Sequence, residues 1–348
     1  MKYSFFDDYS EGIAPELLEY IASNNDDQQL GYCNDDYCVL GSERIRKAFE
    51  CPNVDVHYLP NGTIANVVGM SSILKPFEGV ISASSGHINT HEAGALEATG
   101  HKILWVESPD GKLTPDLITM AYKTYENEHT VRPRVVYITQ PTELGSLYSK
   151  SELGSIIGCA KSNNLYVYMD GARLAMALAS PLTDLTMKDY GSIGIDMFYI
   201  GGTKNGGLFG EAMLILNDEL KPDFRSHMKQ RGALMAKGRF MGQQFARYFD
   251  EDDLYMKLAL NATETATALA RGLKEQGVEI EENGTNQLFP VLHNDVIAKL
   301  SLNYGFYVWE KTSESHSRIR LVTSWATKKT MIVEFLSDLS EILKDSNS

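Results

Sequence analysis

A single lysine, Lys204, lies between two pairs of glycines in the stretch YIGGTKNGGLFGEAMLIL, residues 199–216. Lysine is usually a solvated surface residue, but this one stands in a turn that small residues leave uncrowded. A lysine in such a place can bind phosphate or act as a covalent amine nucleophile. The local stretch is compatible with both roles, and the rest of the chain has to decide between them.

The glycines around Lys204 do not match two common nucleotide-binding patterns. The Walker pattern requires Ser or Thr after the lysine and then a helix, whereas here Asn205 follows and a strand-like run comes next. No G-x-G-x-x-G follows the first predicted strand either. The order of the residues therefore excludes both a Walker-type phosphate site and a G-x-G-x-x-G dinucleotide site.

A phosphate-binding pattern of another kind lies earlier in the chain. Asn61, Gly62 and Thr63 directly precede a helix-period run within YLPNGTIANVVGMSSIL, residues 58–74. Glycine lets the backbone approach a ligand closely, and the free N–H groups at a helix start favour an anion. Taken alone, such a stretch is more commonly an ordinary N-cap made by Asn61 or Thr63.

A carboxylate ends a buried strand-like run in LYVYMDGARLAM, residues 165–176. Burying Asp170 there costs several kcal/mol unless the carboxylate has a partner. That partner is either the nearby Arg173 or a cationic ring nitrogen, as pyridoxal phosphate requires. Lys204 follows only one strand later, so both residues are expected at the same edge of the sheet.

A histidine follows an earlier strand-like run in SGHINTHEAGALEATG, residues 85–100. His87 could stack on an aromatic cofactor or move protons near neutral pH, whereas His91 and His101 are interpreted as hydrogen-bonded structural histidines. The chain thus carries, in order, an N-G-T helix start, a histidine after a strand, D-G-A-R, and T-K between glycines. Together these signals are more specific than any one of them.

Seven strand-like runs alternate with helix-period segments in the first two thirds of the chain. Such alternation predicts an α/β fold with a mostly parallel seven-stranded sheet and helices on both faces. Only a short turn joins the last two runs, so these are predicted to be antiparallel, with Lys204 at the end of a strand. The runs are residues 55–59, 79–83, 102–106, 134–139, 165–169, 196–200 and 212–216.

The pattern changes beyond residue 250. A long helix and a closing helix enclose a mixture of strand-like and helical segments, which predicts a smaller α+β domain. We therefore expect a large domain with an N-terminal arm over residues 1–245 and a small domain over residues 246–348. The segments are 254–276, 287–292, 294–304, 306–310, 318–324 and 328–344.

Composition limits the partners of the chain. Its 348 residues carry a net charge of −14, which argues against nucleic acid or an anionic membrane surface as the main partner. No stretch has the length of a signal peptide core or of a membrane span, so a cytoplasmic protein is expected. The four cysteines have no metal-site spacing and are interpreted as reduced, structurally incidental thiols, and no metal site is predicted.

With these motifs in place, the sequence resembles the threonine aldolase and aromatic β-eliminating lyase group of pyridoxal-phosphate enzymes, which have an aspartate-aminotransferase-like fold. The similarity extends from LEYIASNNDDQQLGYCNDD to RIRLVTSWAT, and low-specificity L-threonine aldolases are the nearest match. The resemblance implies cleavage of L-threonine or L-allo-threonine to glycine and acetaldehyde, with pyridoxal 5′-phosphate as cofactor.

The resemblance also implies roles for individual residues. Lys204 forms a Schiff base with the cofactor, Asp170 pairs with its ring nitrogen, and His87 stacks on the ring. The phosphate is bound by the helix start and by the residue before the lysine: Asn61, Gly62, Thr63 and Thr203.

Further roles concern the substrate and a neighbouring subunit. Arg173 lies near the ring oxygen and the substrate carboxylate, and Arg320 binds that carboxylate as a bidentate fork. Tyr32 matches a tyrosine near the active site that often reaches it across a subunit interface. Arg231 or Lys237 matches a basic stretch that reaches the neighbour's phosphate, so a homotetramer of paired dimers, or a homodimer, is expected.

Three positions depart from the family pattern. Glu143 stands where threonine aldolases often have a histidine, and it could serve as the base for the substrate hydroxyl while disfavouring an acidic substrate side chain. Asp7 stands where a serine near the substrate carboxylate is common, and Cys33 where glycine is common. These departures leave the cofactor chemistry intact and bear on the substrate.

Two other functions stay open from the sequence. The same cofactor could support β-elimination on a serine-, cysteine- or tyrosine-like amino acid, giving pyruvate and ammonia instead of an aldehyde and glycine. A non-catalytic cofactor or amino-acid binding protein on the same scaffold is the third alternative, although Lys204, Asp170 and both arginines are retained.

Overall fold

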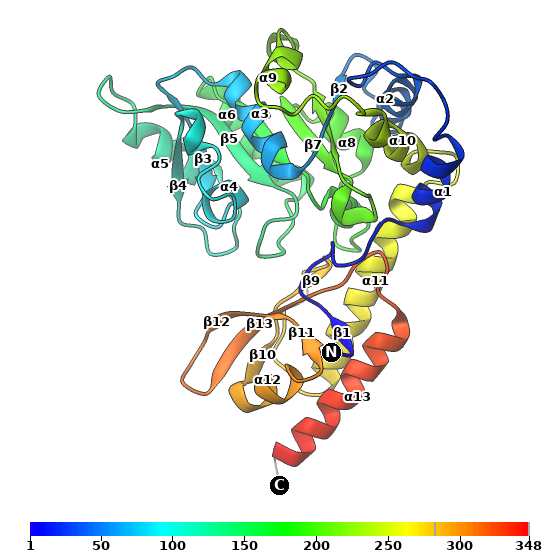
Figure 1. Ribbon diagram of the computed structural model, residues 1–348. Coiled ribbons are helices and arrows are strands. Elements are labelled where there is room, and N and C mark those ends of the chain that lie inside the picture. Colours follow the sequence, from blue (N-terminus) through cyan, green and yellow to red (C-terminus); the bar gives the residue numbers. More distant parts are fainter. Residues whose placement is uncertain (282, 347–348) are drawn as a thin grey trace.

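A seven-stranded sheet forms the centre of the larger part of the molecule in the computed structural model, which describes residues 1–281 and 283–346 (Figure 1). The strand order is β2-β8-β7-β6-β5-β3-β4. Strand β8 is antiparallel to both of its neighbours, and the other pairs are parallel. The predicted mostly parallel sheet and its antiparallel last pair are confirmed. The bounds are β2 Asp55–Leu59, β3 Glu78–Ala83, β4 Lys102–Val106, β5 Arg132–Thr139, β6 Tyr166–Asp170, β7 Met197–Gly201 and β8 Glu211–Ile215.

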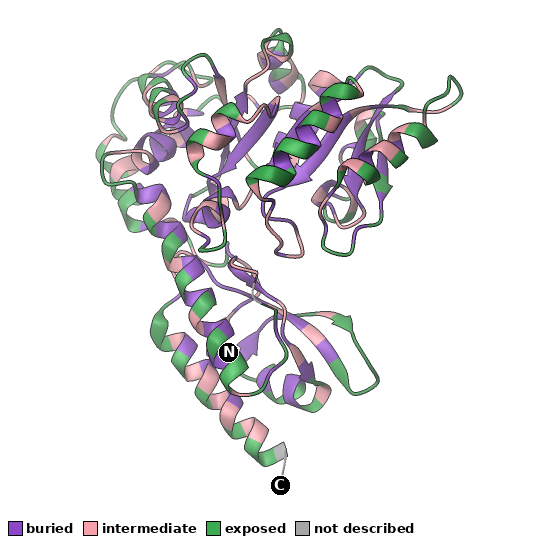
Figure 2. Ribbon diagram, turned by 180° about the vertical axis from the view of Figure 1, so that it is seen from behind, coloured by how far each residue is buried: buried purple, intermediate pink, exposed green. Residues whose placement is uncertain are grey.

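Helices cover both faces of this sheet. Successive strand residues point to opposite faces, so Val80 and Val135 pack on one side while Ile81 and Val136 pack on the other. Helices α3 (Gly62–Ile73) and α9 (Phe224–Gln230) cover the first side. The strands are consequently buried between helices whose outer faces are exposed (Figure 2). The helices of the second side are α1 Pro15–Ser23, α2 Asp36–Ala48, α5 Pro115–Thr124, α6 Lys150–Ser162, α7 Leu174–Leu178, α8 Met187–Ser192 and α10 Arg239–Tyr248.

Side-chain caps explain where several of these helices begin. Asp35, Asn61, Thr114, Ser149 and Thr186 each accept a hydrogen bond from a backbone N–H of the first helical turn. Such caps satisfy donors that have no partner within the helix. The remaining short elements are α4 His87–Thr90 and the 3₁₀ turns Glu97–Thr99, Thr203–Asn205 and Asp218–Leu220.

The smaller part of the molecule holds an antiparallel sheet of order β10-β13-β12, with β9 also paired to β13. The run predicted as one strand at 287–292 is two strands, because Pro290 has no N–H to continue the ladder. Helices α12 and α13 pack beside them (Figure 1). The bounds are β9 Gln287–Leu288, β10 Val291–His293, α12 Asn294–Leu300, β12 Tyr307–Lys311, β13 His316–Val322 and α13 Lys329–Ser346.

Two segments connect the larger and smaller parts. Strand β1 (Tyr3–Ser4) pairs in parallel with β11 (Tyr304–Gly305), so the start of the chain lies against the smaller part. Helix α11 (Leu254–Glu275) contributes its first half to the core of the large sheet and its second half to the core of the small one. The division at residue 245 stays a prediction. None of the helices formed by the described residues is long and apolar enough to cross a membrane.

Candidate active site

The carboxyl ends of three parallel strands meet at one edge of the large sheet. Asp170 ends β6, Lys204 follows β7 in the 3₁₀ turn, and Glu143 follows β5. A cavity of about 230 Å³ opens there. It brings together nine of the residues predicted from the sequence, namely Asn61, Gly62, Thr63, His87, Glu143, Asp170, Arg173, Thr203 and Lys204.

Asp170 is held ionised at the floor of this cavity. Tyr137 and Asn66 donate to its Oδ2 at 2.8 and 3.0 Å, and Tyr199 donates to its Oδ1 at 2.5 Å. Burial alone would raise the pKa of this carboxyl, but the charge of His87 and these hydrogen bonds hold the pKa below its ordinary value. The alternative of a local ion pair with Arg173 is wrong, because that arginine binds another carboxylate.

Lys204 lines the same cavity in a strongly charged neighbourhood. Burial lowers the pKa of its amine, and the nearby Arg173 guanidinium lowers it further. The lysine is therefore more readily deprotonated than a surface lysine. Next to it, Glu211 accepts hydrogen bonds from the Gly202 N–H and the Thr203 hydroxyl at 2.7 and 3.0 Å. Burial raises the pKa of Glu211 to about 7.

The start of α3 forms an anion-binding wall of the cavity. Asn61 accepts a hydrogen bond from the Ile64 N–H at 2.9 Å, so the N-cap interpretation is confirmed. The cap leaves the N–H groups of Gly62 and Thr63 without partners inside the helix, and both residues line the cavity. A Cβ at position 62 would lie 3.0 Å from the Tyr199 hydroxyl, so glycine keeps this corner open.

Glu143 and His87 form the opposite wall. The Glu143 carboxylate accepts hydrogen bonds from the His87 backbone N–H at 3.2 Å and from the Thr139 hydroxyl at 3.1 Å. Burial raises the pKa of Glu143 to about 7, and the negative charge of Asp170 acts in the same direction. The His87 ring is fixed through Nδ1, which lies 2.8 Å from the Glu92 carboxylate.

Arg173 is clamped by a carboxylate that the sequence analysis did not identify. Asp8 is fully buried, and its oxygens accept from Arg173 Nε at 2.7 Å and from a terminal nitrogen at 3.1 Å. Asn286 also donates to Asp8 at 2.9 Å. The clamp joins the N-terminal arm to the loop after β6 and fixes the direction of the guanidinium.

Replacing Asp8 with asparagine should destabilise the protein by about 3–5 kcal/mol, because it leaves the charge of Arg173 buried without its partner. Urea unfolding of the variant measures this loss. Asp7→Asn is the matched control, since the ion pair that Asp7 makes within the described part of the chain, with Arg320, is longer at 3.5 Å. Equal losses in the two variants would contradict the importance assigned to the Asp8 clamp.

A second cavity of about 260 Å³ adjoins the first and shares Tyr9, His87, Glu143, Arg173 and Lys204 with it. It adds the predicted residues Asp7 and Arg320 together with aromatic side chains of β12. The Arg320 guanidinium lies 4.9 Å from the Tyr307 ring centre and 5.1 Å from that of Trp309. Its Nε is buried and has no hydrogen-bond partner among the described residues.

Three predicted residues lie away from both cavities. Tyr32 is 42% exposed, its N–H donates to the Ala236 carbonyl, and Lys229 lies 4.5 Å above its ring. Arg231 has a buried Nε for which the described residues provide no partner, and Lys237 is exposed. Within one chain these residues form a separate surface near the start of α2.

Several residues of the site were not predicted. Asn66 is the informative case, because a buried amide in an otherwise apolar helix run is itself a signal of a polar partner. It bridges Glu92 and Asp170 at 2.7 and 3.0 Å. Other unpredicted residues that line or support the cavities include Asp8, Tyr9, His91, Tyr137, Tyr199, Glu211, Tyr307 and Trp309.

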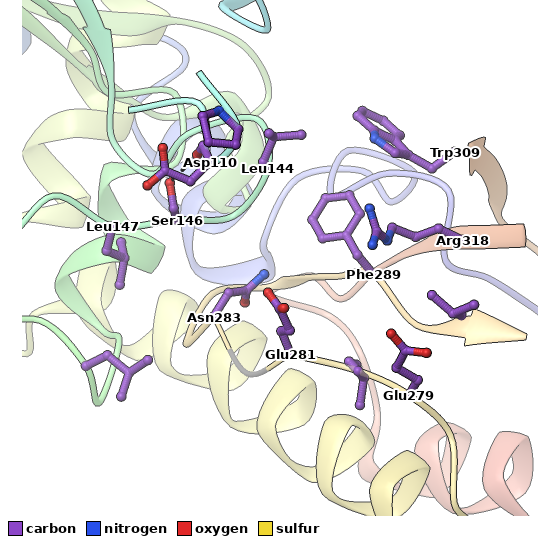
Figure 3. Close-up of a pocket in the computed structure, with 14 residues that line it drawn as sticks. Asp110, Leu144, Ser146, Leu147, Glu279, Glu281, Asn283, Phe289, Trp309 and Arg318 are labelled. Atoms are coloured by element: carbon purple, nitrogen blue, oxygen red, sulfur yellow. Dashed lines mark hydrogen bonds between the residues drawn. The ribbon is translucent and has the colours of Figure 1, made fainter. Parts of the chain in front are cut away.

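A larger cavity of about 580 Å³ lies between the two parts of the molecule. Figure 3 shows Asp110, Leu144 and Ser146 on one side and Phe289 and Trp309 on the other. None of the predicted site residues lines it. It adjoins the site through Trp309, which also lines the second cavity, and through Asp110 and Ser146, which hydrogen-bond Thr142 of the first cavity. Because the predicted residues line the two smaller cavities, we place the chemistry there.

The chain is similar to known proteins in sequence and in structure. Residues 15–295 match the family described as β-eliminating lyase. A low specificity L-threonine aldolase from Pseudomonas sp. (strain NCIMB 10558) is 33% identical over 97% of this chain and 96% of its own. Threonine aldolase from Leishmania major is 43% identical, with a TM-score of 0.95 over 98% of this chain and 99% of the other. An aspartate aminotransferase from Thermus thermophilus is 14% identical with a TM-score of 0.70 over 97% and 91% of the two chains, which shows the shared fold.

Proposed function

Because the chain belongs to the β-eliminating lyase family, we propose that it is a pyridoxal-phosphate-dependent carbon–carbon lyase. It cleaves L-threonine, L-allo-threonine or related β-hydroxy-α-amino acids to glycine and an aldehyde. The full-length similarity to threonine aldolases supports this activity. The structural observation that carries it is one cavity holding a lysine of lowered pKa, an ionised buried aspartate and a glutamate with a pKa of about 7.

The side chains of the first cavity suit pyridoxal 5′-phosphate. Asp170 stays ionised and would hold the ring nitrogen in its protonated form, and Lys204 would hold the aldehyde carbon covalently. His87 would lie against the ring. When bound, the cofactor supplies an electron sink for the pair released as the Cα–Cβ bond breaks. The phosphate would be held by Asn61, Gly62, Thr63 and Thr203.

The second cavity provides the substrate contacts. Arg320 has a buried, unsatisfied Nε and a lowered pKa caused by burial and by Arg173, so a substrate carboxylate would replace a missing partner. Arg173, oriented by Asp8, adds a second positive charge in the same cavity. These contacts fix the amino acid with its hydroxyl-bearing carbon toward the wall made by Glu143 and His87.

Glu143 is the group that we assign to the substrate hydroxyl. Its carboxylate is anchored by the His87 N–H and the Thr139 hydroxyl, and with a pKa of about 7 it can accept a proton near neutral pH. Removing that proton allows the hydroxyl oxygen to become the carbonyl oxygen of the aldehyde. His87, whose Nδ1 is occupied by Glu92, is the alternative acceptor through Nε2.

Product analysis tests the proposed reaction directly. With pyridoxal phosphate and L-threonine, the purified enzyme should form acetaldehyde and glycine in equal amounts. Formation of pyruvate and ammonia from serine- or cysteine-like amino acids, without aldehyde from threonine, would favour the β-eliminating alternative. No turnover of either class would favour the non-catalytic alternative.

We also expect a homo-oligomer, a homotetramer or homodimer, in a cytoplasmic enzyme. Tyr32, Arg231 and Lys237 line neither cavity of their own chain, and the buried Arg231 Nε lacks a partner within the described part of the chain. A neighbouring subunit's phosphate would satisfy that nitrogen. Light scattering of the holoenzyme should therefore give at least a dimer, and a monomer with full activity would contradict the cross-subunit roles.

A further inference from the structure

Two thiols meet at the beginning of α2, away from the cavities described above. Cys33 precedes Asp35, the N-cap of the helix, and Cys38 lies in its first turn. Cys38 is 2% exposed, and its Sγ lies 3.7 Å from the Gly238 carbonyl oxygen. A Cβ on Gly238 would overlap the Sγ of Cys33. Both sulfurs therefore face the same glycine from the same side of the helix start.

A small cavity of about 190 Å³ gives access to both sulfurs. Arg225, one of its lining residues, donates to the Tyr32 carbonyl at 2.8 Å and to the Asn34 side chain at 3.2 Å. These two residues flank Cys33, so the guanidinium lies beside its thiol. A neighbouring arginine favours the thiolate, which is the reactive form of cysteine.

The surroundings of the two thiols distinguish their roles. The neighbouring Cys38 and the charge of Arg225 lower the pKa of Cys33 against the effect of burial. The neighbouring Cys33 and burial raise the pKa of Cys38. Cys33 is thus the nucleophile, and Cys38 is the protonated partner beside it.

The cavity also holds a buried polar atom without a partner. Nε2 of His57 has no hydrogen-bond partner within the described residues, and the ring lines the cavity. Burial, together with the charges of Arg225 and Arg46, lowers the pKa of His57 to about 4, so the ring is neutral. It can accept a hydrogen bond from a small polar molecule that enters. No group of three or more potential metal ligands occurs among the described residues.

The backbone at Cys33 is strained in a way that glycine would avoid. Tyr32 and Cys33 both have φ of 59°, in the left-handed region that non-glycine residues rarely adopt. Strain of this kind persists where surrounding contacts impose it, and it is frequent at functional sites. Here the contacts are those of Arg225 and of the Ala236 carbonyl, which accepts from the Tyr32 N–H at 3.1 Å.

We propose that Cys33 and Cys38 form a reversible dithiol site that hydrogen peroxide and related hydroperoxides oxidise to an intrachain disulfide. The Cys33 thiolate attacks the peroxide, so that an S–O bond forms while the O–O bond breaks and water leaves. The Cys38 sulfur then attacks Cys33, forming the S–S bond and releasing the oxygen as a second water. Overall, two thiols are oxidised, one peroxide is reduced to two waters, and the turn at Tyr32 is tied to α2.

Peroxide treatment of the holoenzyme tests this site. Two of the four thiols should be lost, and dithiothreitol should restore both. Trypsin cuts after Lys2 and next after Arg44, so both cysteines lie in the peptide 3–44, which should lose two hydrogen atoms in mass. The visible band of the covalently bound cofactor should persist, because neither thiol lines the two cavities that hold Lys204.

Matched variants separate this chemistry from general oxidation. Cys38→Ser and Cys33→Gly should form no disulfide, and glycine at position 33 also removes the backbone strain, so that variant is expected to fold. Cys159→Ser should behave as the unmodified protein. Disulfides with another pairing, preferential oxidation of Cys51 or Cys159, or an overoxidised Cys33 beside a reduced Cys38 would overturn the proposal.

Discussion

Replacing Lys204 with alanine should remove the covalently bound chromophore of the holoenzyme and lower kcat/KM for L-threonine by about 10⁴- to 10⁶-fold. Losses of that size follow removal of the covalent nucleophile from other enzymes. Burial and the Arg173 charge lower the pKa of the lysine, and this environment makes its amine nucleophilic. The visible absorption spectrum after dialysis and an aldehyde assay measure the two effects.

Lys188→Ala is the control for this experiment. Lys188 is exposed and pairs with Glu50 at the surface, so its loss should change neither the spectrum nor the rate. If the Lys204→Ala protein kept a visible band that dialysis cannot remove, the cofactor would be bonded to another amine. If the band were lost while the rate stayed normal, the cofactor would not take part in the reaction.

The positions of Asp170 and Lys204 could be predicted because they depend on local sequence. Each follows a short apolar run, and alternation with helices makes those runs parallel neighbours whose ends share one edge. The structure places β6 and β7 side by side in this way. The predicted strand bounds agree with the structure within a residue or two for the same reason, since short runs bounded by turn residues define them.

The surroundings of Asp170 could not be predicted by the same reasoning. Helices cover both faces of the sheet, so the parts of its central strands that approach the site are largely apolar and carry no alternation that tells which side chains face the site. Nothing local therefore indicates that Tyr137 and Tyr199 donate to Asp170. Once the strand register is known, both tyrosines are seen on the face covered by α3.

The Asp8–Arg173 clamp required the tertiary structure for a different reason. The two residues are 165 positions apart, and the N-terminal arm reaches the site only because β1 pairs with β11 in the smaller part. The resemblance to the family predicted Asp7 as a site residue, whereas the fully buried carboxylate belongs to the next residue, Asp8. A shift of one residue in an extended arm changes which side chain points inward.

Replacing Glu143 with glutamine should lower kcat/KM for L-threonine by about 10²- to 10⁴-fold, the usual contribution of a positioned acid–base group. Glutamine has nearly the same shape but cannot accept the hydroxyl proton. The wild-type rate should rise with pH through about 7, where Glu143 loses its proton, and the variant should lack this rise. The pH profiles of kcat/KM, measured for the wild type and for the variant, test this difference.

Stability should change in the opposite direction to activity. Burial raises the folded-state pKa of Glu143 from its ordinary 4.5 to about 7, so the folded protein resists ionisation that the unfolded chain undergoes freely. The wild type therefore loses stability as pH rises from about 5 to above 7, and glutamine removes that loss. We expect Glu143→Gln to be more stable by about 3 kcal/mol at pH 8 and nearly unchanged at pH 4.5, in urea unfolding.

The combination of a slower and more stable variant distinguishes a catalytic carboxylate from a structural one. A structural role predicts that Glu143→Gln loses stability and activity together, and an exposed control, Glu126→Gln, should change neither. If the variant kept both its rate and the rise with pH, Glu143 would not be the proton acceptor. The burial of Glu143 that costs the fold stability at alkaline pH is also what keeps a base with a pKa of about 7 beside the substrate hydroxyl.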